Sequence, residues 1–198
     1  MKRFEKLNLM SIIEKDYNFL PKNLPIPVDD GLCNHLEGME IPDISLQAIN
    51  GEYVKLRRKE SFKLIFFCYP MTGKLGEALP KNWNNIPGAR GCTVQNRSFS
   101  DNYDEFTKLN SIPIGITTQS IDEIKEMTNR LKIEHDILSD CSLIFAKSLN
   151  LPTFSVSNKV FIKRLTLIVD DFKIIKFFYP IFPPNQHVKE VISWLQKN

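Results

Sequence analysis

The sequence contains no C-x-x-C pair, and its four cysteines, Cys33, Cys68, Cys92 and Cys141, are separated by 35, 24 and 49 positions. The missing pair excludes a zinc ribbon and a dithiol redox motif, because both require two closely spaced thiols. Four cysteines in 198 residues are also too few for a fold built on disulfides. We therefore expect reduced thiols, most of which pack as small hydrophobic side chains.

Long apolar runs are also missing from the chain. The longest ones, residues 64–69 and 177–182, are far shorter than the ~20 residues that a transmembrane helix needs. The charged residues spread over positions 1–19 leave no apolar core for a secretory signal. The sequence therefore predicts a cytoplasmic protein that does not enter a membrane.

The chain also has little net charge, and it lacks groups of metal-ligating residues at the usual spacing. The 26 Lys and Arg residues against 23 Asp and Glu residues give a net charge of +3 with no dense basic run, so we expect no nucleic-acid partner. His35, His135 and His187 are far apart in sequence and lack ligand spacing, so we expect neither a metal nor another cofactor. The 42% of hydrophobic residues is ordinary for a globular protein.

The pattern along the chain predicts one domain with an N-terminal extension. We expect residues 1–40 to form that extension, a short helix followed by a proline-rich arm, and residues 41–198 to form the domain. Within the domain, apolar patterns predict strands near 44–46, 53–56, 62–69, 112–117, 137–138, 165–169 and 173–179. Helical periodicity and capping residues predict helices near 93–109, 120–131 and 139–149, and a last one from Asn185. This order is typical of an α/β protein with a thioredoxin-like fold, in which helices flank a central mixed sheet.

Cys92 stands out among the four thiols because of what precedes it. The buried strand at 62–69 is followed by a long loop, 71–91, which holds four of the eight glycines, and Cys92 then begins a helix. The positive end of a helix dipole favours the thiolate, which is the reactive form of cysteine. Arg90 is the nearest cation in sequence and Arg164 is a more distant one. The alternative interpretation is a cysteine that only packs the first helical turn.

Several segments together resemble the peroxiredoxins, in the bacterioferritin-comigratory (PrxQ-like) and redoxin-domain subgroup. The segment GCTVQ at 91–95 resembles the family pattern around its peroxidatic cysteine. In the same order along the chain, FCYP at 67–70, LSD at 138–140 and KRLTLIVD at 163–170 resemble further family segments. The resemblance covers about residues 40–197, and it is the joint order of the segments that carries it.

The resemblance implies a thiol peroxidase that reduces hydrogen peroxide or organic hydroperoxides through a sulfenic acid on Cys92. In the family, a Pro, a Thr, a Cys and an Arg build the site. By their context, Pro70, Cys92 and Arg164 match three of these, and Thr72 is the candidate for the fourth. Loop 71–91 also contains Trp83, which we expect either to cover the cysteine or to anchor the loop.

The sequence departs from the family pattern at two positions. The family places its threonine three residues before the cysteine, where this chain has Ala89; Thr93 is a second substitute beside Thr72. Relatives often carry a resolving cysteine five residues after the peroxidatic one, where this chain has Arg97. The resemblance then implies a one-cysteine cycle with an external thiol reductant (thioredoxin, glutaredoxin or a small thiol), and Cys141 or Cys33 as other resolving candidates.

A second function remains open at this point. Ala89 and Arg97 are also compatible with a thioredoxin-fold redox sensor or binding module without efficient turnover. Either function suits a monomer or a homodimer.

Overall fold

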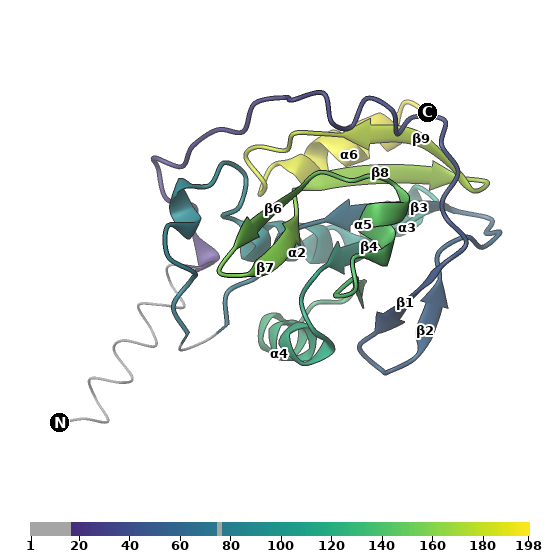
Figure 1. Ribbon diagram of the computed structural model, residues 1–198. Helices are drawn as coiled ribbons and strands as arrows, with labels where there is room; N and C mark the ends of the chain where they lie inside the picture. The colour runs from purple at the N-terminus through teal and green to yellow at the C-terminus, as the bar shows by residue number, and fades with distance from the viewer. Residues whose placement is uncertain (1–16, 75–76) are drawn as a thin grey trace.

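A mixed sheet of seven strands, in the order β2-β1-β5-β4-β3-β8-β9, forms the centre of the computed structural model, which describes residues 17–74 and 77–198 (Figure 1). The strands are β1 Ser45–Ala48, β2 Tyr53–Lys55, β3 Lys63–Cys68, β4 Ser111–Thr117, β5 Asp136–Ser139, β8 Leu165–Asp170 and β9 Lys173–Phe178. The β3-β4 and β4-β5 pairs are parallel, and the other pairs are antiparallel. The predicted thioredoxin-like α/β fold is confirmed.

The central strand β3 divides the core into two layers because its side chains alternate between the two faces of the sheet. Leu64, Phe66 and Cys68 belong to a cluster that also contains Phe145. Ile65, Phe67 and Tyr69 belong to a second cluster that also contains Cys92, Phe99, Ile124 and Val191. A nearly continuous apolar run is therefore what this strand needs, since both of its faces are buried.

Helices cover both faces of the sheet. They are α2 Cys92–Asp101, α3 Tyr103–Lys108, α4 Ile121–Leu131, α5 Ile144–Ser148 and α6 His187–Leu195, with a short 3₁₀ helix η1 at Trp83–Asn85. The helix predicted near 120–131 begins with a capping box, in which the side chains of Ser120 and Glu123 accept from each other's backbone N–H groups. None of the helices among residues 17–74 and 77–198 is long and apolar enough to cross a membrane.

The structure corrects the predicted helix over 93–109, which is divided into α2 and α3 at Asn102. The Asn102 backbone leaves the helical region (φ −112°, ψ 17°), and its side-chain amide donates to the Ser98 carbonyl at 2.8 Å. Phe99 and Phe106 nevertheless stack with ring centroids 5.5 Å apart in the same core layer. The helical spacing of the apolar side chains is therefore kept on both sides of Asn102 although the helix is interrupted there.

Two further boundaries differ from the prediction. The helix predicted over 139–149 is limited to α5, because the Asp140 carboxylate accepts from the backbone N–H groups of Phe145 and Ala146 at 2.9 and 3.0 Å and caps the helix from upstream. The last helix begins after Gln186 instead of Asn185. The helix predicted within residues 1–20 lies, up to position 16, outside the described residues.

A hairpin that the sequence analysis did not predict joins β6 Thr153–Val156 to β7 Lys159–Ile162 outside the main sheet. Ser157 and Asn158 form its turn, and both have positive φ (49° and 62°). Two left-handed residues are what a tight two-residue hairpin requires, so this turn was the signal that could have located the strands.

The N-terminal arm, purple in Figure 1, runs past β9 before it reaches β1. The Gly38 N–H donates to the Ile174 carbonyl at 2.8 Å, and the Ile174 N–H donates to the Met39 carbonyl at 2.9 Å. Cys33 and Leu36, which fall in the predicted extension, are fully buried in the first core layer. This part of the arm is therefore packed into the domain.

Candidate functional site

Cys92 is the first residue of α2, so its side chain lies at the end of the helix where backbone N–H groups are free. Gly91, just before it, has a φ of 104°, which a side chain rarely adopts. A Cβ at Gly91 would also overlap Cγ of Pro184 and lie 2.7 Å from Cδ2 of Leu20. Glycine is thus required here for both conformation and space, and this fixes the direction in which Cys92 enters the site.

Arg164 reaches the sulfur from the link between β7 and β8. Its Nη2 lies 3.2 Å from Sγ of Cys92 and also donates to the carbonyls of Gly88, Ala89 and Arg90 at 3.2 to 3.4 Å. Its Nη1 donates to Oε1 of Gln95. Because the guanidinium bonds both the end of the loop and the first turn of α2, it holds the cysteine between them.

Arg164 brings a buried positive charge to this site. The side chain is only 3% exposed, and no Asp or Glu of residues 17–74 and 77–198 forms an ion pair with it. A buried cation is costly unless an anion or several dipoles compensate it. Three loop carbonyls supply dipoles, and a thiolate on Cys92 would supply the anion. The structure therefore places a buried positive charge 3.2 Å from the sulfur.

Two buried donors in the site have no hydrogen-bond partner among the described residues. They are Nε of Arg164 and Nε2 of Gln95. Buried N–H groups in native proteins are nearly always hydrogen-bonded. These two donors therefore mark positions where the oxygen of another molecule can accept a hydrogen bond.

The cavity that Cys92 lines is very small, about 10 Å³, and the residue is 2% exposed. Tyr17, Met71, Leu79 and Trp83 are among its walls. The Tyr17 hydroxyl donates to the Glu77 carbonyl at 2.7 Å. Its ring lies under the Arg90 guanidinium at 5.0 Å.

Trp83 belongs to a third hydrophobic cluster, which attaches loop 71–91 to the β6-β7 hairpin. Its ring meets that of Phe161 edge to face at 5.0 Å and that of Phe154 at 5.7 Å. Because the same ring also lines the Cys92 cavity, both roles expected of Trp83 are observed: it covers the cysteine and it anchors the loop.

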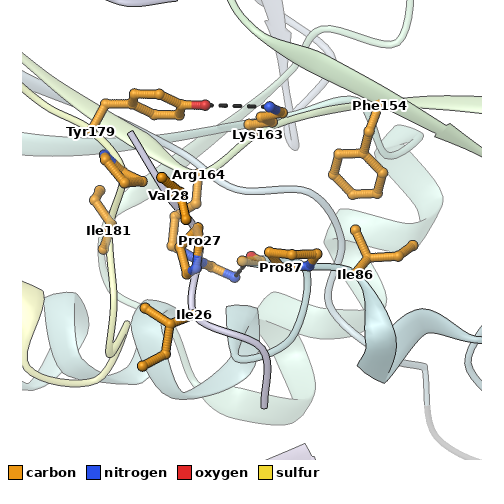
Figure 2. Close-up of a pocket in the computed structure, with 12 residues that line it drawn as sticks. Ile26, Pro27, Val28, Ile86, Pro87, Phe154, Lys163, Arg164, Tyr179 and Ile181 are labelled. Atoms are coloured by element: carbon orange, nitrogen blue, oxygen red, sulfur yellow. Dashed lines mark hydrogen bonds between the residues drawn. The ribbon is translucent and has the colours of Figure 1, made fainter. Parts of the chain in front are cut away.

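A second cavity, of about 270 Å³, has Arg164 in its wall but not Cys92 (Figure 2). Its other walls are mostly apolar and include Ile26, Phe154 and Ile181. Lys163 lies at its rim, bonded to the Tyr179 hydroxyl at 3.4 Å. Gly88 lines this cavity, Arg90 lines the cavity of Cys92, and the carbonyls of residues 88–90 all accept from Arg164.

The structure does not bring Thr72 to the sulfur, which is a correction to the expected site. The Thr72 hydroxyl donates to Oε1 of Gln119 at 3.1 Å, and the Thr72 N–H donates to the same oxygen at 2.9 Å. Thr72 lines a different cavity, whereas Thr93 lines the cavity of Cys92. Pro70 does not line the Cys92 cavity either; its carbonyl accepts from the Thr117 hydroxyl at 3.0 Å and so fixes the start of the loop.

The other three cysteines lie apart from Cys92. Cys33 and Cys68 belong to the core layer on the opposite face of the sheet, where burial raises the pKa of Cys33 to about 12 and raises that of Cys68. Such thiols are neutral and unreactive. Cys141 is exposed and lines a separate pocket of about 330 Å³, which shares only Met71 with the cavity of Cys92.

Sequence reasoning missed two residues of the site, Gln95 and Tyr17. Gln95 lies three positions after Cys92, and residues at this spacing share one face of a helix, so the pair could have been found. Tyr17 lies in the N-terminal extension, and nothing in the sequence connects it with a loop 60 positions later.

The fold and the site together define a thioredoxin-like protein with a buried cysteine–arginine pair. Residues 84–178 match the AhpC/TSA family. The chain is 24% identical over 161 residues to the chloroplastic peroxiredoxin Q of Oryza sativa subsp. japonica, covering 81% of this chain and 66% of the rice protein. The chloroplastic peroxiredoxin Q of Suaeda salsa is equally similar, with 67% of its length covered. The chain thus spans about two thirds of these relatives.

Solved structures with the same fold include peroxidoxin BcpB from Mycobacterium tuberculosis, with a TM-score of 0.66 and 22% identity over 82% of this chain and 98% of that one. Peroxiredoxin Q from Xanthomonas campestris has a TM-score of 0.64 and 17% identity over 83% and 97% of the two chains. The chain is therefore similar in sequence to AhpC/TSA proteins over residues 84–178 and to peroxiredoxin Q over 161 residues, and it shares the fold of these solved structures.

Proposed function

We propose that the protein is a thiol-dependent peroxidase that uses Cys92 as its only redox-active cysteine. The observation that carries this proposal is the 3.2 Å distance between Nη2 of Arg164 and Sγ of Cys92 at the first position of a helix. A cation and a helix N-terminus both stabilise a thiolate, and the thiolate is the nucleophile that peroxides require.

The first step oxidises the sulfur by two electrons. The Cys92 thiolate attacks the terminal oxygen of H–O–O–R, a sulfur–oxygen bond forms and the oxygen–oxygen bond breaks. The products are a sulfenic acid on Cys92 and RO⁻, which takes a proton from water or a neighbouring donor. Arg164 is the cation beside the charge that develops on the departing oxygen, and its Nε is a donor without a partner among the described residues.

The second half of the cycle uses a thiol from outside the chain. Arg97, at the position where relatives carry a resolving cysteine, lies on the surface of α2 and bonds Oδ1 of Asn18 at 2.9 Å. An external thiol condenses with the sulfenic acid, releasing water and leaving a mixed disulfide; a second thiol then displaces Cys92 in its reduced form. The reductant is a small thiol, a thioredoxin or a glutaredoxin.

The competing function is a redox sensor that is oxidised without rapid turnover. The observation that favours it is the burial of Cys92 at 2% exposure in a cavity of about 10 Å³. The Arg164 contact favours the peroxidase, because a cation beside the sulfur lowers the barrier to its reaction with peroxide.

The test is to mix reduced protein with one equivalent of hydrogen peroxide and trap sulfenic acid with dimedone, followed by peptide mass analysis. The peroxidase predicts labelling within seconds that is confined to Cys92, and repeated turnover when dithiothreitol is supplied. Labelling of Cys92 without turnover would select the sensor. Peroxide left unreacted over minutes would remove both.

A further inference from the structure

We propose that Tyr17 and Trp83 determine which peroxides reach Cys92, and that they select hydrogen peroxide over hydroperoxides that carry a bulky apolar group. This inference rests on the proposed peroxidase function and names its substrate class. Neither residue belongs to the Cys92–Arg164 pair; both are walls of the cavity that Cys92 lines.

The size of the cavity gives the first argument. Its volume of about 10 Å³ is close to the smallest that holds one water molecule. Hydrogen peroxide is only one oxygen atom larger than water, so small displacements of the walls admit it. An aryl hydroperoxide brings a whole ring to the same place. Its leaving group is a bulky alkoxide that must also get out, whereas the hydroxide from hydrogen peroxide leaves as water.

The construction of the walls gives the second argument. Trp83 is 2% exposed and is held between the rings of Phe154 and Phe161, so moving it would open the third cluster. The Tyr17 ring lies directly on Gly73, where even a Cβ would come within 2.7 Å of it, and its hydroxyl is bonded to the Glu77 carbonyl. Both side chains are therefore fixed from more than one direction.

The larger cavity of about 270 Å³ does not offer another route for a bulky group. Arg164 lines it, but Cys92 does not. Gly88 lines this cavity and Arg90 lines the cavity of Cys92, and the carbonyls of residues 88–90 all accept from Nη2 of Arg164.

The experiment compares single-turnover rate constants of the full chain with hydrogen peroxide and with cumene hydroperoxide. The variants are Tyr17→Ala and Trp83→Ala. Tyr17→Phe keeps the ring and removes only the hydroxyl, and Tyr53→Ala removes a tyrosine that is 70% exposed on β2. Circular dichroism and a thermal melt report whether each variant is folded. Tyr17→Ala keeps the test valid if Trp83→Ala loses its loop, because Tyr17 is outside the third cluster.

We expect the wild-type chain to react at least about tenfold faster with hydrogen peroxide, the order of discrimination that a packed pocket provides. In Tyr17→Ala or Trp83→Ala this preference should fall severalfold through a gain with cumene hydroperoxide, while both control variants keep the wild-type ratio. Equal rates in the wild-type chain, or a ratio that neither variant changes, would overturn the inference and leave the peroxidase intact. Failure with both peroxides would instead overturn the proposed function.

Discussion

Arg164 Nη2 lies 3.2 Å from Cys92 Sγ although 72 positions separate the two residues, and three loop carbonyls accept from the same nitrogen. The arginine is thus fixed by the segment that leads into the cysteine. We expect Arg164→Ala to lower the rate constant for oxidation of Cys92 by hydrogen peroxide by about 10²- to 10³-fold, as the loss of one preorganised donor does in other sites. Stopped-flow fluorescence of the reduced protein measures this rate.

Arg164→Lys should recover only part of that rate, because an ammonium cannot bond the sulfur, the carbonyls and Gln95 with a planar fork. Arg97→Ala is the matched control, since Arg97 is a surface residue of the same helix as Cys92. A rate in Arg164→Ala within threefold of that control, roughly the scatter of such effects, would contradict the assignment.

Gln95 acts through Arg164, so it is a positioning residue. Gln95→Leu keeps the size of the side chain but removes the acceptor for Nη1, and we expect about a tenfold loss of the oxidation rate, the order of one hydrogen bond to a charged group. The double variant Gln95→Leu with Arg164→Lys reports the mechanism. If the glutamine serves the arginine, the two losses combine to less than their product. Losses that multiply would show two independent roles.

Gly91→Ala tests the backbone that presents Cys92. The substitution forces an L-residue to a φ of 104° and drives its Cβ into Pro184 and Leu20. We expect the free energy of unfolding to fall by about 2–4 kcal/mol from strain and overlap together, as measured by urea denaturation. Gly38→Ala, at a φ of 86° with open space around its Cβ, is the control for strain alone and should cost about 1 kcal/mol.

His135 makes stability depend on pH. Burial lowers the pKa of this imidazole from 6.5 to about 3, and its Nδ1 has no partner among the described residues. Since the folded pKa is below the unfolded one, the unfolded chain binds more protons between these values, and stability falls as pH drops from 6.5 towards 3. His135 contributes a slope of about 1.4 kcal/mol per pH unit to the free energy of unfolding.

His135→Phe should flatten the curve of unfolding free energy against pH in that window. The variant leaves Oδ1 of Asn96 without its imidazole partner at every pH, so it shifts the curve vertically without changing its slope. Burial raises the pKa of Asp140, so this carboxyl group makes stability rise as pH drops. The effect is the same in the wild type and in His135→Phe, so it cancels in the difference between their curves. A slope identical to the wild type would show that the His135 imidazole is not held neutral.

The remaining thiols give a separate prediction. Cys33→Ser and Cys141→Ser should both retain turnover with an external thiol, because neither residue lies in the Cys92 cavity, whereas Cys92→Ser should lose it. Oxidised wild-type protein without reductant should gain the mass of one oxygen atom. A loss of two hydrogen atoms with a peptide joining Cys92 to Cys141 would replace the one-cysteine cycle by an internal disulfide.

The fold could be read from sequence where the residues act locally. The apolar run of β3 and the Ser120 capping box specify their elements without help from distant residues. The division of α2 from α3 could not be read in this way, because Phe99 and Phe106 keep the helical period across Asn102.

The sequence alone singled out Cys92 at the start of a helix, and the family resemblance added Arg164 as its partner; the structure places the two together. Thr72 was chosen for its closeness to Pro70 in sequence, but its hydroxyl is bonded to Gln119, a partner 47 positions away that no local pattern indicates. Tyr17 was missed for the same reason, since its contact with the loop depends on the tertiary path of the arm.

The third cluster has a consequence for how such a loop can change in length. Trp83, packed on Phe154 and Phe161, attaches the loop to the hairpin that leads directly into Arg164. The 21 residues between Pro70 and Cys92 therefore carry an anchor of their own. Insertions and deletions between Pro70 and Trp83 would change only the part of the loop that precedes Trp83. The number of residues from proline to cysteine could then vary while the geometry at the sulfur stays the same.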